Sequence, residues 1–217
     1  MATDFPQIAA ILIRLAEEVA NKKEWLVELD SRIGDGDLGL TMERGFSALA
    51  EESAKYEDKD IGKFFVKAGL VLNKVAPSTM GTLVSTAIMR MGKTWNGKTE
   101  LTPEDIFTGF EAAVVGIKER GKSQLGDKTV LDALIPAVDA LKEGLLEGKD
   151  LPNALRDAYQ AALKGFEHTK EMQSKVGRAS WFQEGSIGNP DPGAGLVTVV
   201  FSVLAGEEIP GIADAYV

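Results

Sequence analysis

Apolar residues recur every three or four positions along most of the chain. This spacing places them on one face of an α-helix, so it predicts a series of amphipathic helices. The apolar stripes are Ile8, Ile11, Leu12, Leu15 and Val19; Phe46 and Leu49; Ile61, Phe64, Phe65, Ala68 and Leu72; Leu83, Ala87 and Met91; Ile106, Phe110, Ala113, Val114 and Ile117; Val130, Leu131, Leu134, Val138 and Leu141; and Leu155, Tyr159, Ala162, Leu163 and Phe166.

Helix-start signals support several of these stripes. Thr102 can cap a helix whose first turn holds Pro103 and two acidic residues. We expect Asp127 to open the next helix, and Leu151-Pro152 to precede another. The apolar run 194–205 is a buried helix or a strand; its length favours a helix, although its valines favour a strand.

No hairpin signal recurs, and no segment alternates convincingly between apolar and polar residues. The pattern therefore predicts an all-α fold, a single-domain barrel or bundle of about eight antiparallel helices over residues 1–217. A chain of 217 residues is long enough to bury a full core without a disulfide or a metal.

Composition excludes several function classes. The chain has no cysteine and only one histidine, His168, which excludes disulfide scaffolds, zinc–cysteine sites and multi-histidine metal sites. Its net charge of −9 disfavours binding to nucleic acid or to anionic membranes. The N-terminal residues lack a basic segment before an uninterrupted apolar run, so they do not resemble a signal peptide, and we expect a cytoplasmic protein.

Three connections are rich in Gly, Asp and Pro: 29–41, 74–82 and 177–195. In the first, Asp30, Asp35 and Asp37 lie within eight residues and alternate with glycines. Close carboxylates repel unless a cation lies among them, and Mg²⁺ is commonly held by carboxylates together with substrate phosphates. The segment that follows, 41–44, is typical of a helix N-terminus, which attracts phosphate. A plain solvated turn remains the alternative; an EF-hand loop fails, because Phe46 occupies the position of its glutamate.

The other candidates carry weaker signals. Arg178 could bind a phosphate or carboxylate, but the residues alone favour the simpler interpretation, a helix cap at Asp191 followed by Pro192. Residues 77–82 could cradle a phosphate or merely begin a helix, and 121–129 could touch a nucleotide or form a solvated loop. We expect His168, between charged neighbours, to be an exposed surface residue.

Taken together, these motifs resemble those of one family, the ADP-binding L subunits of dihydroxyacetone kinases (DhaL). The resemblance covers roughly residues 5–205 and rests on motifs that occur in the same order: Asp30-x4-Asp35-Gly-Asp37-x-Gly39, Arg120-Gly121-Lys122 with Gly126-Asp127-Lys128-Thr129, and Gly177-Arg178-Ala179-Ser180 followed by Asp191-Pro192-Gly193-Ala194. It implies a barrel of eight antiparallel helices with the nucleotide, ADP or ATP, bound at one end.

The resemblance also assigns roles to residues of this chain. It implies that Asp30, Asp35 and Asp37 are the catalytic carboxylates and hold two Mg²⁺ ions. It further implies nucleotide contacts from Leu38, Gly39, Leu40, Thr41, Thr79, Met80, Gly121, Val130, Arg178, Asp191, Pro192 and Gly193. The chain departs from the family pattern at Leu38, where a polar residue is common, at Thr41, where Asn is usual, and at 76–81, where the family often has Gly-Gly-Ala-Ser-Gly.

The implied partners are a K subunit that carries the ketose and an M subunit that supplies the phosphoryl group. The short chain favours this phosphotransferase-linked form over the fused, ATP-dependent kinase, and it leaves a homodimer open. The alternatives are a kinase module for another substrate, either an erythrulose-like ketose or one like that of fatty-acid kinases, and a non-catalytic, nucleotide-dependent regulator.

Overall fold

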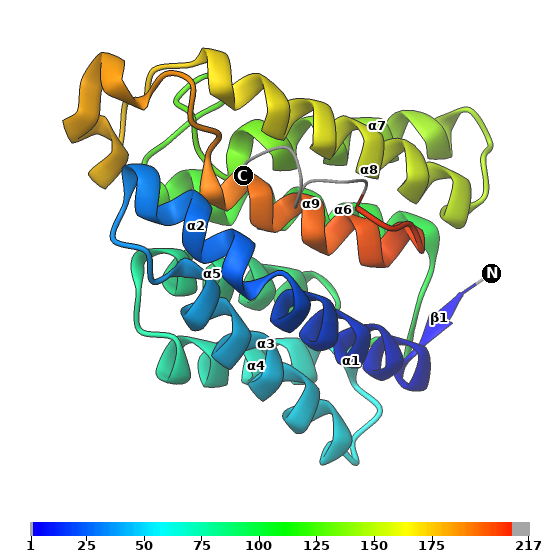
Figure 1. The fold of residues 1–217 in the computed structure, drawn as a ribbon. Coiled ribbons are helices and arrows are strands. Elements are labelled where there is room, and N and C mark those ends of the chain that lie inside the picture. The colour runs from blue at the N-terminus through cyan, green and yellow to red at the C-terminus, as the bar shows by residue number, and fades with distance from the viewer. Residues whose placement is uncertain (1, 210–217) are drawn as a thin grey trace. The chain divides into compact units, whose positions relative to one another are not determined.

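The computed structural model describes residues 2–209 and is helical apart from its connections and a two-residue strand pair (Figure 1). The elements are β1 (Thr3–Asp4), α1 (Phe5–Asn21), α2 (Lys23–Ile33), α3 (Leu38–Ala54), α4 (Ile61–Val75), α5 (Thr79–Thr94), β2 (Glu100–Leu101), α6 (Pro103–Gly121), α7 (Leu131–Leu146), α8 (Leu151–His168), the 3-10 helices η1 (Thr169–Glu171) and η2 (Arg178–Ser186), and α9 (Pro192–Ala205). The all-α fold predicted from the sequence is confirmed.

The chain folds into two compact units, which are described separately. The first comprises the residues up to Ala20 together with Leu40–Gln124, and the second comprises Asn21–Gly39 together with the residues from Leu125 onward. None of the helices in residues 2–209 combines the length and apolar character needed to cross a membrane.

In the first unit, α5 packs against both α4 and α6. The N-terminus of α6 has the predicted cap: Thr102 and Asp105 form a reciprocal capping box. The indole Nε1 of the buried Trp95 donates to the Asp105 carbonyl at 2.7 Å and so joins the end of α5 to the start of α6.

In the second unit, α8 packs against α7 and α9, and α2 packs against α9. Helix α9 buries eleven of its 14 residues, which explains why its sequence is apolar without helical periodicity. The run 194–205 is therefore a helix, as its length indicated: its backbone groups are satisfied within the helix, and burial outweighs the strand preference of its valines.

The structure corrects four expectations. The nine α-helices among residues 2–209 agree with the predicted number of about eight, but α2 was not among the helices predicted. Helix α2 has only Leu26, Leu29 and Ile33 as its buried face, a stripe too sparse to stand out among charged neighbours. The short pair β1–β2 was not predicted either. Segments 29–41 and 74–82, expected as long connections, are largely helical. Only residues 34–37 of the first and 76–78 of the second lie outside helices.

The fourth correction concerns the start of α7. Asp127 does not open this helix; the helix begins at Leu131 with Val130 as its N-cap residue. The backbone N–H groups of Gly126 and Thr129 instead donate to the Asp132 carboxylate, each at 2.6 Å. These two hydrogen bonds to Asp132, a buried residue inside the helix, therefore hold the preceding turn against the first turn of α7.

A glycine in α8 allows close packing against α7. A Cβ added at Gly165 would collide with the Asp132 carbonyl and lie 2.9 Å from the Ala133 Cα. We predict that Gly165→Ala lowers the free energy of unfolding by about 1–2 kcal/mol, because overpacking against backbone outweighs the helix propensity that alanine adds. Urea denaturation measures this difference. Gln160→Ala, at an exposed position of the same helix, is the control and should change stability by less than about 0.5 kcal/mol. Equal effects of the two substitutions would contradict the prediction.

Candidate metal and phosphate site

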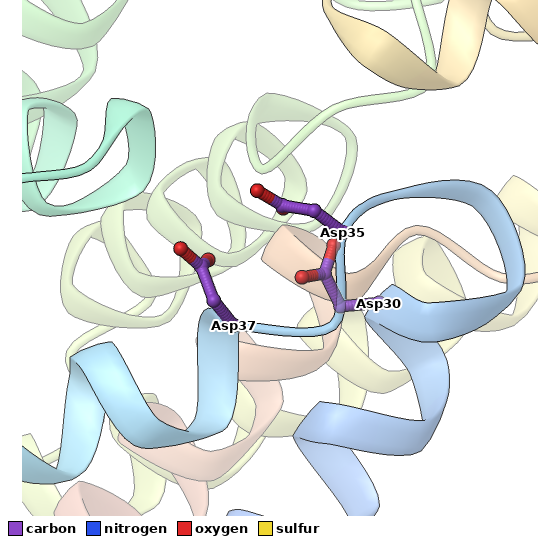
Figure 2. Close-up of side chains that lie close together, drawn as sticks. All are labelled: Asp30, Asp35 and Asp37. Atoms are coloured by element: carbon purple, nitrogen blue, oxygen red, sulfur yellow. The ribbon is translucent and has the colours of Figure 1, made fainter.

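Three aspartates gather where α2 ends and α3 begins. Asp30 lies in the last turn of α2, and Asp35 and Asp37 lie in the turn that follows it. One carboxylate oxygen from each lies within 4.8 Å of the others, and Figure 2 shows the three side chains on one side of the turn. The spacing in the sequence thus becomes a cluster of oxygen ligands of the kind that Mg²⁺ prefers.

Two glycines shape this turn. Gly36 has φ +73°, a left-handed conformation that glycine adopts without steric cost. At Gly34 the chain passes so close to Asp30 that an added Cβ would collide with the Asp30 carboxylate. Asp30 also accepts a hydrogen bond from the Leu38 N–H at 3.2 Å, which fixes the first residue of α3 relative to the end of α2. The turn is therefore bent tightly around Asp30.

The environments of the carboxylates differ. Asp30 is half-buried, whereas Asp35 and Asp37 are exposed. Burial raises the pKa of the Asp30 carboxyl above its ordinary value; the nearby charge of Asp37 adds to this effect, and the Leu38 N–H opposes it. Three close anions are a costly arrangement, and a bound cation relieves it. The donor set, three carboxylates with two of them open to solvent, fits a divalent cation that keeps ligand positions for phosphate or water.

The first turn of α3 follows the aspartates immediately. Leu38, Gly39 and Thr41 are buried and Leu40 is exposed, so the apolar side chain at 38 points into the core instead of presenting a polar group. Because the Leu38 N–H donates to Asp30 and the Thr41 N–H is used within the helix, the N–H groups of Gly39 and Leu40 are the remaining donors of the first turn. Such a helix N-terminus favours anions.

Arg178 reaches the aspartates from a distant part of the sequence. It begins η2, directly after Gly177 with φ +67°, and its guanidinium Nη1 forms an ion pair with the Asp35 carboxylate. The Arg178 side chain remains 60% exposed, so further guanidinium N–H groups are open to a ligand. The sequence allowed Arg178 to pair with a phosphate or a carboxylate, and in the structure its partner is a carboxylate.

Asp191 caps the buried helix α9. Its carboxylate accepts the Ala194 N–H at 2.7 Å, and its own N–H donates to Thr169 Oγ1 at 2.8 Å. Burial is the main cause that raises the pKa of Asp191 to about 7; the charge of Asp132 adds to the rise, and the positive charge of Lys128 opposes it. The cap that the sequence predicted is thus present, and its carboxyl group is buried among polar and charged groups.

The remaining predicted residues are placed as follows. Thr79 and Met80 occupy the first turn of α5, which Ser78 caps through the Gly81 N–H at 3.0 Å, and Gly121 ends α6. All three belong to the first unit. Val130 is buried at the start of α7 in the second unit. Their contacts with a nucleotide remain a prediction. His168 ends α8 with its side chain 65% exposed, as expected.

Sequence reasoning missed two buried charged residues, Lys128 and Asp132. Lys128 was considered only as part of a loop that could touch a nucleotide. An aspartate at 132, inside an otherwise apolar helical stripe, was the signal that this turn carries a buried polar network.

Comparison with known proteins places these motifs in a family. The model of the DAK2 domain matches residues 32–206. The PEP-dependent dihydroxyacetone kinase ADP-binding subunit DhaL of Escherichia coli is 35% identical over 94% of this chain and 98% of its own. The corresponding subunit of kinase 1 of Listeria innocua is 35% identical over 89% of this chain and 91% of its own.

A solved structure shares the fold. The dihydroxyacetone kinase from C. freundii, in complex with AMP-PNP and Mg²⁺, superposes with a TM-score of 0.72 at 25% identity. The match covers 96% of this chain but only 35% of that kinase chain. The chain thus spans about a third of that kinase.

The raised pKa of Asp191 predicts a pH dependence of stability. The folded state retains a proton up to about pH 7 that the unfolded chain releases near the ordinary value of 3.8, so stability falls as pH rises between these values and is constant above them. Between pH 5 and pH 8 we expect the wild type to lose about 2 kcal/mol relative to Asp191→Asn, which keeps an acceptor for the Ala194 N–H.

Urea denaturation of both proteins at the two pH values measures this difference, and other titrating groups cancel in the comparison. Parallel pH profiles of the wild type and Asp191→Asn would contradict the prediction.

Proposed function

The chain belongs to the DAK2 domain family, and we propose that it is the nucleotide-binding subunit of a dihydroxyacetone kinase that transfers a phosphoryl group to a short ketose. The observation that carries the proposal is the cluster of Asp30, Asp35 and Asp37 with Arg178 beside it. The two DhaL relatives, matched over nearly their whole length, are PEP-dependent ADP-binding subunits, which favours the phosphotransferase-linked form.

In this proposal Asp30, Asp35 and Asp37 hold two Mg²⁺ ions. When bound, the ions neutralise charge on the phosphates of ADP or ATP, as in other phosphoryl-transfer sites. The Leu38 N–H orients Asp30 and Arg178 orients Asp35 before a ligand arrives, so less ordering of these two carboxylates is needed on binding. The Leu38 N–H keeps Asp30 oriented and thereby links the metal ligands to the start of α3.

The chain's own groups would orient the nucleotide. Residues Leu38 to Thr41 would contact a phosphate at the N-terminus of α3, with the N–H groups of Gly39 and Leu40 as donors. Arg178 would exchange part of its pairing with Asp35 for a phosphate oxygen, for which its planar fork is suited. Further contacts with the nucleotide are proposed for Thr79, Met80, Gly121, Val130 and Asp191–Gly193, with residues 1–217 acting as one nucleotide-binding domain.

The proposed assembly divides the reaction among three chains. A K subunit holds the ketose, this chain holds the nucleotide, and an M subunit restores the phosphoryl group to bound ADP. The acidic character of the chain is consistent with a role that involves neither nucleic acid nor a membrane surface, and we place the assembly in the cytoplasm.

Nucleotide binding should depend on the aspartates. Asp35→Asn and Asp37→Asn each preserve side-chain size but remove a charged ligand, a loss of about 2 kcal/mol that weakens Mg²⁺-dependent ADP binding roughly 30-fold. Isothermal calorimetry with and without Mg²⁺ measures the affinity. Asp139→Asn, an exposed aspartate of α7, makes the same charge change away from the cluster and should bind as the wild type does. Wild-type affinity in both cluster variants would remove the proposed site.

Transfer to a ketose tests the reaction itself. Mixed with K- and M-type subunits and a PEP-driven phosphate supply, the chain should support phosphorylation of dihydroxyacetone, and Arg178→Ala should slow it about 100-fold through lost charge stabilisation. Arg156→Ala, an exposed arginine paired with Glu207, is the matched control and should leave the rate unchanged.

Failure of the wild type to phosphorylate dihydroxyacetone or erythrulose, from either PEP or ATP, would contradict the proposal and would favour the regulatory alternative.

A further inference from the structure

A lysine is almost completely buried beside the segment that carries Arg178. Lys128 is 1% exposed and has φ +60°, a left-handed conformation that is costly for a side chain with a Cβ. Its Nζ donates to the Met172 carbonyl at 2.9 Å and to the Ser186 carbonyl at 2.5 Å. Burying an ammonium group and holding a non-glycine residue at positive φ both cost free energy. The contacts that the Lys128 ammonium group makes must therefore compensate for these costs.

Both carbonyls belong to one segment, residues 169–191, at places 14 residues apart. Three further hydrogen bonds close the base of this segment: the Gly188 N–H donates to the Lys170 carbonyl at 2.7 Å, the Ser174 N–H to Ser186 Oγ at 2.9 Å, and the Asp191 N–H to Thr169 Oγ1 at 2.8 Å. Hydrogen bonds therefore join the beginning and the end of this segment, and the Lys128 ammonium group bridges the same two parts.

The part of the segment beyond this base contains Arg178 and is more open. Arg178 is 60% exposed at the side chain, and Trp181 is 81% exposed. Apolar packing therefore contributes little to holding Arg178 beside Asp35, and its position depends on where the base of the segment is fixed.

The same lysine interacts with the cap of α9. Burial lowers the pKa of Lys128, while the charge of Asp191 opposes that shift, so the two groups lie close enough to interact electrostatically. Asp191 begins the sequence 191–193, and its N–H donates to Thr169 at the start of the segment. One buried ammonium group thus connects the base that carries Arg178 to the N-terminus of α9.

We propose that Lys128 is a positioning residue for the phosphate site: by joining the Met172 and Ser186 carbonyls it holds the two sides of segment 169–191 together and so keeps Arg178 next to Asp35. The proposal deepens the proposed function and rests on it for its nucleotide readout. Lys128 itself touches neither the aspartates nor, in this proposal, the nucleotide.

The test is a double-mutant cycle. Lys128→Met keeps the length of the side chain but removes the ammonium group, and we expect it to weaken Mg²⁺-dependent ADP binding about tenfold, the size typical of losing a supporting partner. In an Arg178→Ala background the same substitution should cause no further loss, because its effect acts through Arg178. Lys164→Met is the control, since Lys164 is an exposed lysine of α8 in the same unit; it should bind ADP as the wild type does.

Two outcomes of the cycle would overturn the proposal: unchanged affinity in Lys128→Met, or a loss of equal size with and without Arg178. The second outcome would mean that Lys128 acts on binding by another route or through general stability.

Amide hydrogen exchange provides a readout that needs no nucleotide and tolerates a weakened protein. In Lys128→Gln we expect faster exchange confined to residues 169–191, with α7, α8 and α9 unchanged. Uniformly faster exchange throughout the second unit would overturn the positioning role. If the wild type does not bind ADP, the proposed function fails, whereas the exchange experiment still decides whether Lys128 fixes this segment.

Discussion

The mutual repulsion of three carboxylates is the constraint around which this site is built. Asp30, Asp35 and Asp37 place oxygens within 4.8 Å of one another, a distance at which anions raise one another's energy. Three features of the fold retain the cluster: a turn that only glycine can adopt at Gly36, a hydrogen bond from the Leu38 N–H to Asp30, and an ion pair of Asp35 with Arg178. Each also leaves oxygens available to a cation. Because a bound cation would relieve the repulsion among the three carboxylates, the cluster favours cation binding.

The packing of the second unit explains how groups distant in sequence support this cluster. Helix α9 is buried on nearly all sides and therefore defines where its N-terminal cap, Asp191, must lie. Asp191, Thr169 and Lys128 form hydrogen bonds at the base of segment 169–191, and Arg178, in the middle of this segment, pairs with Asp35. Core packing, a buried polar network and the exposed charged site thus form one continuous chain of contacts within this unit. The price is a stability that depends on the protonation of Asp191.

Periodic features were predictable from the sequence, and features set by tertiary context were not. The stripes with four or five apolar positions predicted their helices, and the capping residues Thr102 and Asp191 were identified because a cap is a local arrangement. The aspartate cluster was also predictable, since its members lie within eight residues. Helix α2 was missed because only three of its eleven residues are buried, and they define a weak apolar face.

The role of Lys128 could not be inferred from its position in a polar loop. Its burial arises only when segment 169–191 folds over it, and nothing in the nearby sequence specifies that contact. Similarly, the prediction that Asp127 opens α7 was wrong. The backbone N–H groups of the preceding turn donate to the carboxylate of Asp132, which lies within the helix. Both cases involve buried polar groups whose partners are supplied by tertiary structure.

Anomalous diffraction from crystals grown with ADP and Mn²⁺, a substitute for Mg²⁺ with the same preference for oxygen ligands, tests the central claim most directly. The account predicts two anomalous peaks, each ligated by carboxylates of Asp30, Asp35 and Asp37 and by the phosphates of ADP. Nucleotide bound elsewhere on the chain, or nucleotide bound with no metal peak at these three side chains, would contradict it.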